Sequence, residues 1–268
     1  MGRSKLFAMS LGTAAMRLRY AAKTDVGMRR GHNEDCYGIV EEDGLVLVAD
    51  GMGGHAAGEV ASGIATVEVG NFFHDGRATD GSSGVTKNPE LTELQNRLVG
   101  AFKVANRRIF ETARSDGGRK GMGTTLAAAA ILDGQICIAH VGDSRVYQIQ
   151  DGSITRLTRD HSLLEQFKEI NPGMTREEEN NFPHKNVITR ALGLADDVEV
   201  DVKQFAVQRG DFYLLCSDGL SGHVTDEEML EVVSGADDDI VGAVSTLVEL
   251  ANDAGGNDNI TVVLLQCA

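Results

Sequence analysis

Four short apolar runs that follow one another closely are the feature that most constrains the fold. They cover residues 125–132, 135–141, 145–150 and 153–157, and only two or three residues separate each run from the next. Asp133-Gly134 and Asp151-Gly152 fill two of these gaps, and Asp-Gly is a typical pair for a tight hairpin turn. Links this short join only antiparallel strands, so the block predicts an antiparallel meander.

Further strand and helix patterns surround this block. We expect strands over residues 17–24, 37–41, 45–49, 198–207, 212–216 and 260–266. Apolar positions at helical spacing predict helices over residues 57–65, 91–109, 226–233 and 238–251, and a helical turn over 163–170. Strands in runs and helices in pairs lack the regular alternation of a parallel doubly wound sheet. The sequence therefore favours antiparallel sheets covered by helices.

Two polar stretches interrupt this pattern. Residues 76–88 are rich in glycine, serine and aspartate and should form a surface loop. Residues 171–185 hold two of the three prolines and three consecutive glutamates, Glu177 to Glu179. This second stretch predicts an irregular flap over the surface, where we expect substrate selection.

No low-complexity stretch or charge run near the middle of the 268 residues marks a domain boundary. We therefore expect a single catalytic domain over residues 21–268, with its flap at about 161–187, after an N-terminal extension or first strand region over residues 1–20. A signal peptide is the alternative interpretation of that first segment, but Ser10 and Thr13 interrupt its weakly apolar stretch and Arg17 follows at once. No window reaches the apolar length of a membrane span.

Charge and cysteine usage narrow the class of protein. The formal net charge of -15 repels polyanions and argues against a nucleic-acid partner, since such binding depends on basic surfaces that displace phosphate counterions. The four cysteines form no CxxC pair. We expect a reduced, cytoplasmic protein that is a monomer and has no membrane partner.

Aspartates stand at the ends of several apolar strand runs. Asp50 ends one run, Asp143 and Asp218 each follow another, and Asp258 precedes the last, while Glu34 and Asp35 precede a fifth. In antiparallel sheets the end of one strand lies beside the start of its neighbour, so these carboxylates can meet on one rim. Such a cluster costs several kcal/mol in repulsion and desolvation without cations, and Mg²⁺ or Mn²⁺ reverses that sign.

An isolated Asp-Gly pair is usually a turn, and that interpretation holds for Asp133, Asp151 and Asp75. The segment Asp50-Gly51-Met52-Gly53-Gly54 is denser in glycine than a hairpin requires, which lets its backbone approach an ion or oxyanion closely.

If the substrate carries a phosphate, the protein must also supply a cation to bind it, because the overall charge is repulsive. Arg29 and Arg30 are candidates, although a solvated strand end explains both equally well. Two bound cations can then activate a water for in-line attack. No Walker loop and no CxxxxxR thiol motif is present, so nucleotide binding and cysteine-based phosphatase chemistry lack their usual signals.

Eight motifs, in order, carry a resemblance to a known family. They are TDVGMRRGHNEDC (24–36), VADGMGGH (48–55), GMGTTL (121–126), HVGDSRVY (140–147), LTRDHS (157–162), ITRALG (188–193), LLCSDGL (214–220) and GGNDNITVV (255–263). Together they resemble the protein phosphatase 2C family, in its small stand-alone bacterial form. The resemblance implies an α+β fold, a four-layer α-β-β-α sandwich with two central antiparallel sheets flanked by helices and the metal site at one end.

The resemblance also implies roles for single residues. Asp50 would bridge two Mn²⁺ or Mg²⁺ ions, with the Gly51 carbonyl on one ion and Asp218 and Asp258 on the other. Asp143, with Asp218, would hold a third ion. The candidate catalytic residues are Arg30, which matches the phosphate-binding arginine, Glu34 and Asp35, which would hold metal-bound waters, and Asp143.

One position departs from the pattern of some family members. They carry a histidine directly after the aspartate-glycine pair, proposed as general acid, whereas this chain has Met52 there and His55 three residues on. A metal-bound water could protonate the leaving group instead. Of the other histidines, His140 is expected to be a satisfied core residue and His161 to brace the start of the flap.

The implied activity is that of a metal-dependent protein serine/threonine phosphatase, a phosphoric monoester hydrolase that reverses a bacterial serine/threonine kinase. Its partners would be phosphorylated proteins, including a kinase and its substrates. A catalytically silent relative that binds phosphoprotein or metal is one alternative, because fold does not guarantee function, but no ligand aspartate is lost. A two-metal nuclease is a second alternative, and the negative net charge of the chain disfavours it.

Overall fold

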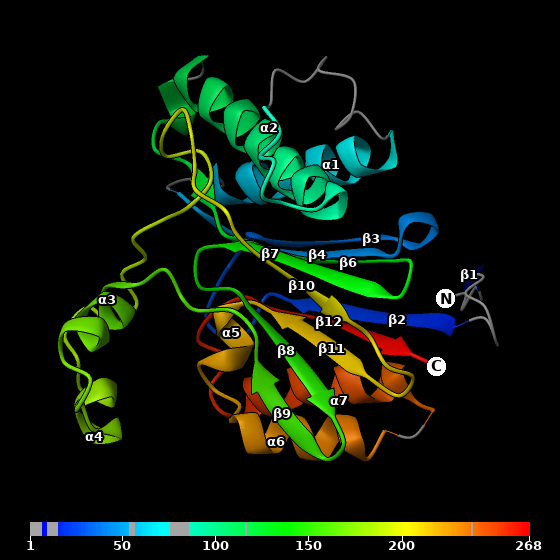
Figure 1. Cartoon of the computed structure of the whole chain (residues 1–268). Coiled ribbons are helices and arrows are strands. Elements are labelled where there is room, and N and C mark those ends of the chain that lie inside the picture. The colour runs from blue at the N-terminus through cyan, green and yellow to red at the C-terminus, as the bar shows by residue number, and fades with distance from the viewer. Residues whose placement is uncertain (1–6, 10–15, 54–56, 76–85, 116, 237) are drawn as a thin grey trace.

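The structure is a computed structural model that describes residues 7–9, 16–53, 57–75, 86–115, 117–236 and 238–268. Two six-stranded sheets form its centre, and all of their described strand pairs are antiparallel (Figure 1). The first sheet has the order β1 (Phe7–Met9), β2 (Met16–Asp25), β12 (Ile260–Cys267), β11 (Phe212–Cys216), β8 (Arg145–Gln150) and β9 (Ser153–Arg156). The second has the order β10 (Asp201–Ala206), β7 (Gln135–Val141), β6 (Leu126–Leu132), β4 (Leu45–Met52) and β3 (Asp35–Val40), with β5 (Gly123–Thr124) paired to the end of β4.

Helices cover the outer face of each sheet, which completes the predicted four layers (Figure 1). The second sheet carries α1 (Ala57–His74) and α2 (Glu93–Ser115), and the first carries α5 (Asp218–Ser221), α6 (Asp226–Ser234) and α7 (Ile240–Asp253). Two short helices, α3 (Leu163–Ile170) and α4 (Arg176–Asn180), project from the body on one side. None of the helices in the described part of the chain is both long enough and apolar enough to cross a bilayer.

Three hydrophobic clusters fill the three spaces between the four layers. Strand β4 shows how one sequence serves two of them: Leu45 and Leu47 pack toward the helices, and Val46 and Val48 pack between the sheets. Because both faces of this strand are buried, it reads as a continuous apolar run. Its rigid, buried course leads directly to Asp50.

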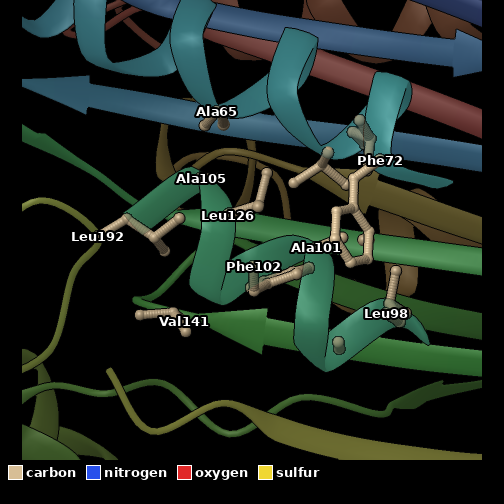
Figure 2. Packing of buried hydrophobic residues seen from close by; sticks show 14 of the residues in the cluster. Ala65, Phe72, Leu98, Ala101, Phe102, Ala105, Leu126, Val141 and Leu192 are labelled. Carbon is tan, nitrogen blue, oxygen red and sulfur yellow. The ribbon is translucent and has the colours of Figure 1, made fainter. Parts of the chain in front are cut away.

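The layer between α1, α2 and the second sheet relies on small side chains at the closest approaches. Figure 2 shows Ala65 of α1 and Ala101 and Ala105 of α2 near the sheet, in the same cluster as the rings of Phe72 and Phe102. Alanines at these positions let the helices approach the sheet closely, and the larger rings fill the remaining space.

The predicted meander is divided between the two sheets, and this is a correction. β6 and β7 form one hairpin, and β8 and β9 form another, each with both turn residues at positive φ, as Asp-Gly hairpin turns require. Between β7 and β8, however, the chain leaves the second sheet and enters the first. Gly142 lies in this link at a φ of 105°, which only glycine adopts readily.

Most predicted elements are confirmed, and the exceptions are local. Strands β7, β8 and β11 and helix α3 have the predicted bounds, whereas β10 begins at Asp201, three residues after the predicted start at 198. The flap is less irregular than expected: Thr175 caps α4 and exchanges two hydrogen bonds with Glu178 in a capping box. The short α5 was also missed. Most of the predicted 76–88 loop lies outside the described residues.

The flap base is held by charge. Glu165 on α3 is buried, and Arg156, Arg159 and Lys168 lie 3.6, 3.2 and 3.1 Å from its carboxylate. The outer part of the flap is exposed and partly apolar, with Ile170 at 79% exposure. The flap therefore has a base held by ion pairs, and further out it exposes the apolar side chain of Ile170 at the end of α3.

Candidate metal centre

Acidic side chains from both sheets meet at one edge of the sandwich. Asp50 lies near the end of β4, Asp143 in the link between the two sheets, Asp218 at the start of α5, and Asp258 just before β12. They share a cavity of about 310 Å³. Its walls include Arg30, Glu34, Asp50, Gly51, Asp143, Asp218 and Asp258. The structure thus brings together seven of the eight candidate site residues in one cavity.

The eighth candidate, Asp35, lies beside the cavity. It is directly opposite Asp50 in the register of β3 and β4 and is only 9% exposed. The Ser217 hydroxyl donates a 2.7 Å hydrogen bond to Asp35 Oδ2 and accepts one from the Thr261 amide. Ser217 therefore orients a carboxylate. This orienting role depends on a contact between residues 182 positions apart in the sequence.

The backbone around Asp50 is held from two sides. The Thr124 hydroxyl donates to the Asp50 carbonyl, and the Asp50 amide donates to the Thr125 hydroxyl. Next to it, a Cβ on Gly51 would lie 2.1 Å from the Gly58 carbonyl oxygen at the start of α1, so only glycine fits. The Gly51 backbone is thereby held in the cavity wall.

Burial and mutual repulsion raise the pKa values of these aspartates. Burial first, and then the charges of neighbouring aspartates, raise the pKa of Asp50 well above the ordinary value and that of Asp143 to about 7. The pKa of Asp35 also rises to about 7, chiefly through burial, and that of Asp218 rises through burial and Asp258. The protein has therefore gathered carboxylates that disfavour one another's ionised form.

Divalent cations fit this arrangement. The Asp218 Oδ1 atom is buried and has no hydrogen-bond partner within the described part of the chain. Leaving a carboxylate oxygen buried and unpaired costs free energy, and a hard cation with oxygen ligands removes that cost. The raised pKa values indicate the same need, because a cation lowers the pKa of nearby acids. Asp50, Gly51, Asp143, Asp218 and Asp258 offer oxygen donors of the kind that Mg²⁺ and Mn²⁺ prefer.

Of the two candidate arginines, the structure places only Arg30 at the cavity. Its Nη2 atom donates a 2.7 Å hydrogen bond to Asp258 Oδ2, and its side chain is half exposed. Arg29 is exposed and does not line the cavity. Asn186 and Ile188, from the end of the flap, also line it. Sequence reasoning missed both, because only folding returns the flap to this edge.

The histidines behave as the sequence predicted. His140 Nε2 lies 2.7 Å from the Arg159 carbonyl, and His161 Nδ1 accepts the Gly142 amide. With Asp201, they form a group whose ligand atoms lie within 4.8 Å of one another. Arg190, however, donates a 2.7 Å hydrogen bond to Asp201 Oδ1, so a cation already neutralises this carboxylate. His161 thus braces the start of the flap. His55, the histidine that follows Met52 by three residues, lies outside the described residues.

Comparison with known proteins agrees with this site. A sequence profile described as Protein phosphatase 2C matches residues 29–261. The chain belongs to the protein phosphatase 2C family. The serine/threonine phosphatase Stp of Listeria innocua is 38% identical over 247 residues, which cover 91% of this chain and 94% of the relative.

Solved structures of the family have the same fold. The serine/threonine phosphatase PstP/Ppp of Mycobacterium tuberculosis superimposes with a TM-score of 0.81 at 34% identity, covering 93% of this chain and 98% of that one. A PstP catalytic domain in complex with two manganese ions superimposes with a TM-score of 0.76 at 34% identity, covering 93% and 97%. This member of the phosphatase 2C family therefore has a relative whose structure contains manganese, a metal that its own carboxylates are suited to bind.

The raised pKa values predict how pH affects the stability of the metal-free protein. Above about pH 4 the unfolded chain has released the protons of Asp35 and Asp143, while the folded chain keeps them until about pH 7. This stabilising contribution is complete below about pH 4, is lost progressively as pH rises from about 4 to about 7, and is absent above that range. We expect the EDTA-treated protein to melt at a lower temperature at pH 8 than at pH 6, and Asp143→Asn to reduce that difference.

Scanning fluorimetry measures both melting temperatures. The exposed Asp253 offers a matched control, because Asp253→Asn removes an equal charge away from the cavity. An Asp143→Asn protein with the full wild-type difference between pH 6 and pH 8 would contradict the assignment of the effect to this cluster.

Proposed function

We propose that the chain is a metal-dependent protein serine/threonine phosphatase that hydrolyses phosphoserine and phosphothreonine on proteins. The observation that carries the proposal is the cavity in which Asp50, Asp218 and Asp258 face one another beside Arg30. It joins a cation-binding carboxylate cluster to a guanidinium that can grip phosphate oxygens. A catalytically silent relative is the alternative, and it is disfavoured because each expected ligand is present in the cavity wall.

The bound Mn²⁺ or Mg²⁺ ions would supply Lewis-acid charge and a water of lowered pKa. We propose that Asp50 bridges two ions, that the Gly51 carbonyl contributes to one, and that Asp218 and Asp258 bind the other. The two-manganese structure of the related PstP domain supports a pair of ions.

The remaining residues act on the substrate and on water. Arg30 would bind the phosphate and orient it for in-line attack, since its guanidinium is exposed at the cavity. Glu34 and Asp35 would accept hydrogen bonds from waters and hold them in place. Met52 lines the cavity where some family members have histidine, so we propose that a water protonates the leaving alkoxide.

Hydrolysis of a phosphothreonine peptide tests the proposal directly. We expect turnover with Mn²⁺, loss of turnover with EDTA, and a fall of about 100-fold or more in Asp218→Asn, because a neutral amide binds a hard cation more weakly than a carboxylate. Asp253→Asn is the control, since that side chain is exposed and outside the cavity. Full activity of the EDTA-treated Asp218→Asn protein would rule out the mechanism.

A third ion is proposed between Asp143 and Asp218. Both carboxylates line the cavity, and the charge of Asp218 contributes to the raised pKa of Asp143. If this ion is separate from the central pair, Asp143→Ala should lower turnover by about tenfold while two Mn²⁺ ions per chain remain bound. Calorimetric titration with Mn²⁺ measures the occupancy, and loss of both central ions in this variant would contradict a separate third site.

The natural substrates are proposed to be phosphorylated proteins, including a serine/threonine kinase and its substrates. We further propose that the enzyme acts as a monomer in the cytoplasm. A flap beside the cavity supports a protein substrate: Asn186 and Ile188 line the cavity, and Phe167 and Ile170 are exposed further out. Such a surface offers apolar contact to residues that flank a phosphorylated side chain.

Flap contact predicts altered substrate preference when its tip changes. Ile170→Ser removes one exposed apolar side chain, and we expect the ratio of kcat/KM for two phosphopeptides with different flanking residues to shift by about fivefold. Val241→Ser is a matched control, because Val241 is also an exposed apolar residue, at 64% exposure. It lies on α7, which covers the outer face of the first sheet, away from the flap. An unchanged ratio in Ile170→Ser would contradict substrate selection by the flap.

A further inference from the structure

Asn259 makes an unusual set of contacts directly behind the metal centre. This residue follows Asp258 and is 5% exposed. Its Nδ2 atom donates to the carbonyls of Val26 and His32, both at 2.9 Å, and its Oδ1 atom accepts the Glu34 amide at 2.8 Å. The side-chain amide of Asn259 thus donates two hydrogen bonds to the backbone of one loop and accepts a third from it.

That loop, residues 26–34, joins β2 to β3 and carries Arg30. The Val26 and His32 carbonyls stand on either side of Arg30 in the sequence, so their common donor closes the neck of the loop. The third bond holds Glu34, where the loop enters β3. A side chain of similar size without both donor and acceptor character, such as leucine or aspartate, cannot make this set of bonds.

The loop is also pressed against the segment that contains Asp258. The Met28 amide donates to the Gly256 carbonyl at 2.7 Å. Gly27 has a φ of 77°, and a Cβ on it would lie 2.2 Å from the Asp258 carbonyl oxygen. The loop therefore rests on the backbone of residues 256–258 with no space for a side chain between them.

Asn259 is bonded to both sides of the Arg30–Asp258 pair. Its own backbone amide donates to Asp258 Oδ1 at 2.8 Å, while Arg30 donates to Asp258 Oδ2 at 2.7 Å. The Arg30 side chain is half exposed, so packing alone does not restrain it. The course of its loop decides where the guanidinium stands.

We propose that Asn259 is a positioning residue for phosphate recognition: its amide clamps the Val26–His32 neck so that Arg30 stands over the cavity beside Asp258. This inference rests on the proposed function. The clamp removes conformational freedom from Arg30 before phosphate arrives, which strengthens binding without adding a contact to the phosphate. It leaves the number of candidate metal ligands unchanged.

Phosphate affinity of the Mn²⁺-loaded full chain tests the clamp. Without the three bonds, we expect Asn259→Ala to bind inorganic phosphate about tenfold more weakly by calorimetry, because the loop that orients Arg30 is then no longer held. KM for a phosphothreonine peptide should rise by a similar factor, with a smaller change in kcat and with Mn²⁺ occupancy retained. Hydrogen exchange of the metal-free variant should be faster in residues 26–34.

Asn106 provides a matched control. It is also a buried asparagine that joins two segments, with Nδ2 donating to the Ala195 carbonyl and Oδ1 accepting the Gly193 amide. It lies on α2 and does not line the cavity. Asn106→Ala should therefore lower the melting temperature without weakening phosphate binding. Equal loss of phosphate affinity in both variants would make the effect a general consequence of destabilisation and overturn the proposal.

Two further variants keep the proposal testable. Gly27→Ala pushes the loop away from Asp258 while Asn259 is intact, and it should weaken phosphate binding in the same way if Asn259→Ala does not fold. In an Arg30→Ala background, Asn259→Ala should cause little further loss, whereas fully additive losses would overturn a role through Arg30.

The two proposals fail in different ways. A wild-type chain that binds phosphate but hydrolyses no phosphopeptide would overturn the proposed function and leave the clamp to be judged by phosphate affinity alone. An active wild type whose phosphate affinity is unchanged by both Asn259→Ala and Gly27→Ala would overturn the clamp and leave the proposed function intact.

Discussion

Repulsion among buried carboxylates is the constraint on which the rest of this structure depends. Burial raises the pKa values of Asp35, Asp50, Asp143 and Asp218, and the charge of at least one neighbouring aspartate raises each of them further. A chain free to relax would separate them. They stay together because each lies at or near the end of a strand, or in a link between strands, whose course is set by apolar packing elsewhere.

The fold meets this constraint with backbone restraints near the cavity. Strand β4 is buried on both faces up to Asp50, and the hydroxyls of Thr124 and Thr125 bond the carbonyl and the amide of Asp50. Ser217 donates a hydrogen bond to Asp35, and Asn259 holds the loop that carries Arg30. These restraints come from neutral hydroxyl and amide groups. They orient the charged groups without neutralising them, so the carboxylates remain available to cations and the guanidinium to phosphate.

The flap differs from the cavity in what stabilises it. Its base depends on ion pairs around Glu165 and on hydrogen bonds between His161, Gly142 and Thr189, while its tip exposes Ile170. One end of the flap starts beside the link that contains Asp143, and the other returns to the cavity at Asn186 and Ile188. The surface that we propose contacts protein substrates is thus connected through a few backbone bonds to one of the candidate metal ligands.

Local sequence patterns determined much of this protein: the bounds of most strands, the antiparallel sheets, and the aspartates at strand ends. Tertiary structure alone decided how these parts combine. The block of four strands divides between two sheets at Gly142, and neither its spacing nor its alternation indicates this, because each hairpin has the same pattern in one sheet or in two. Likewise, Ser217 meets Asp35 across 182 residues and Asn259 meets Val26 across 233. Such contacts follow from the order of strands in a sheet, which apolar periodicity does not encode.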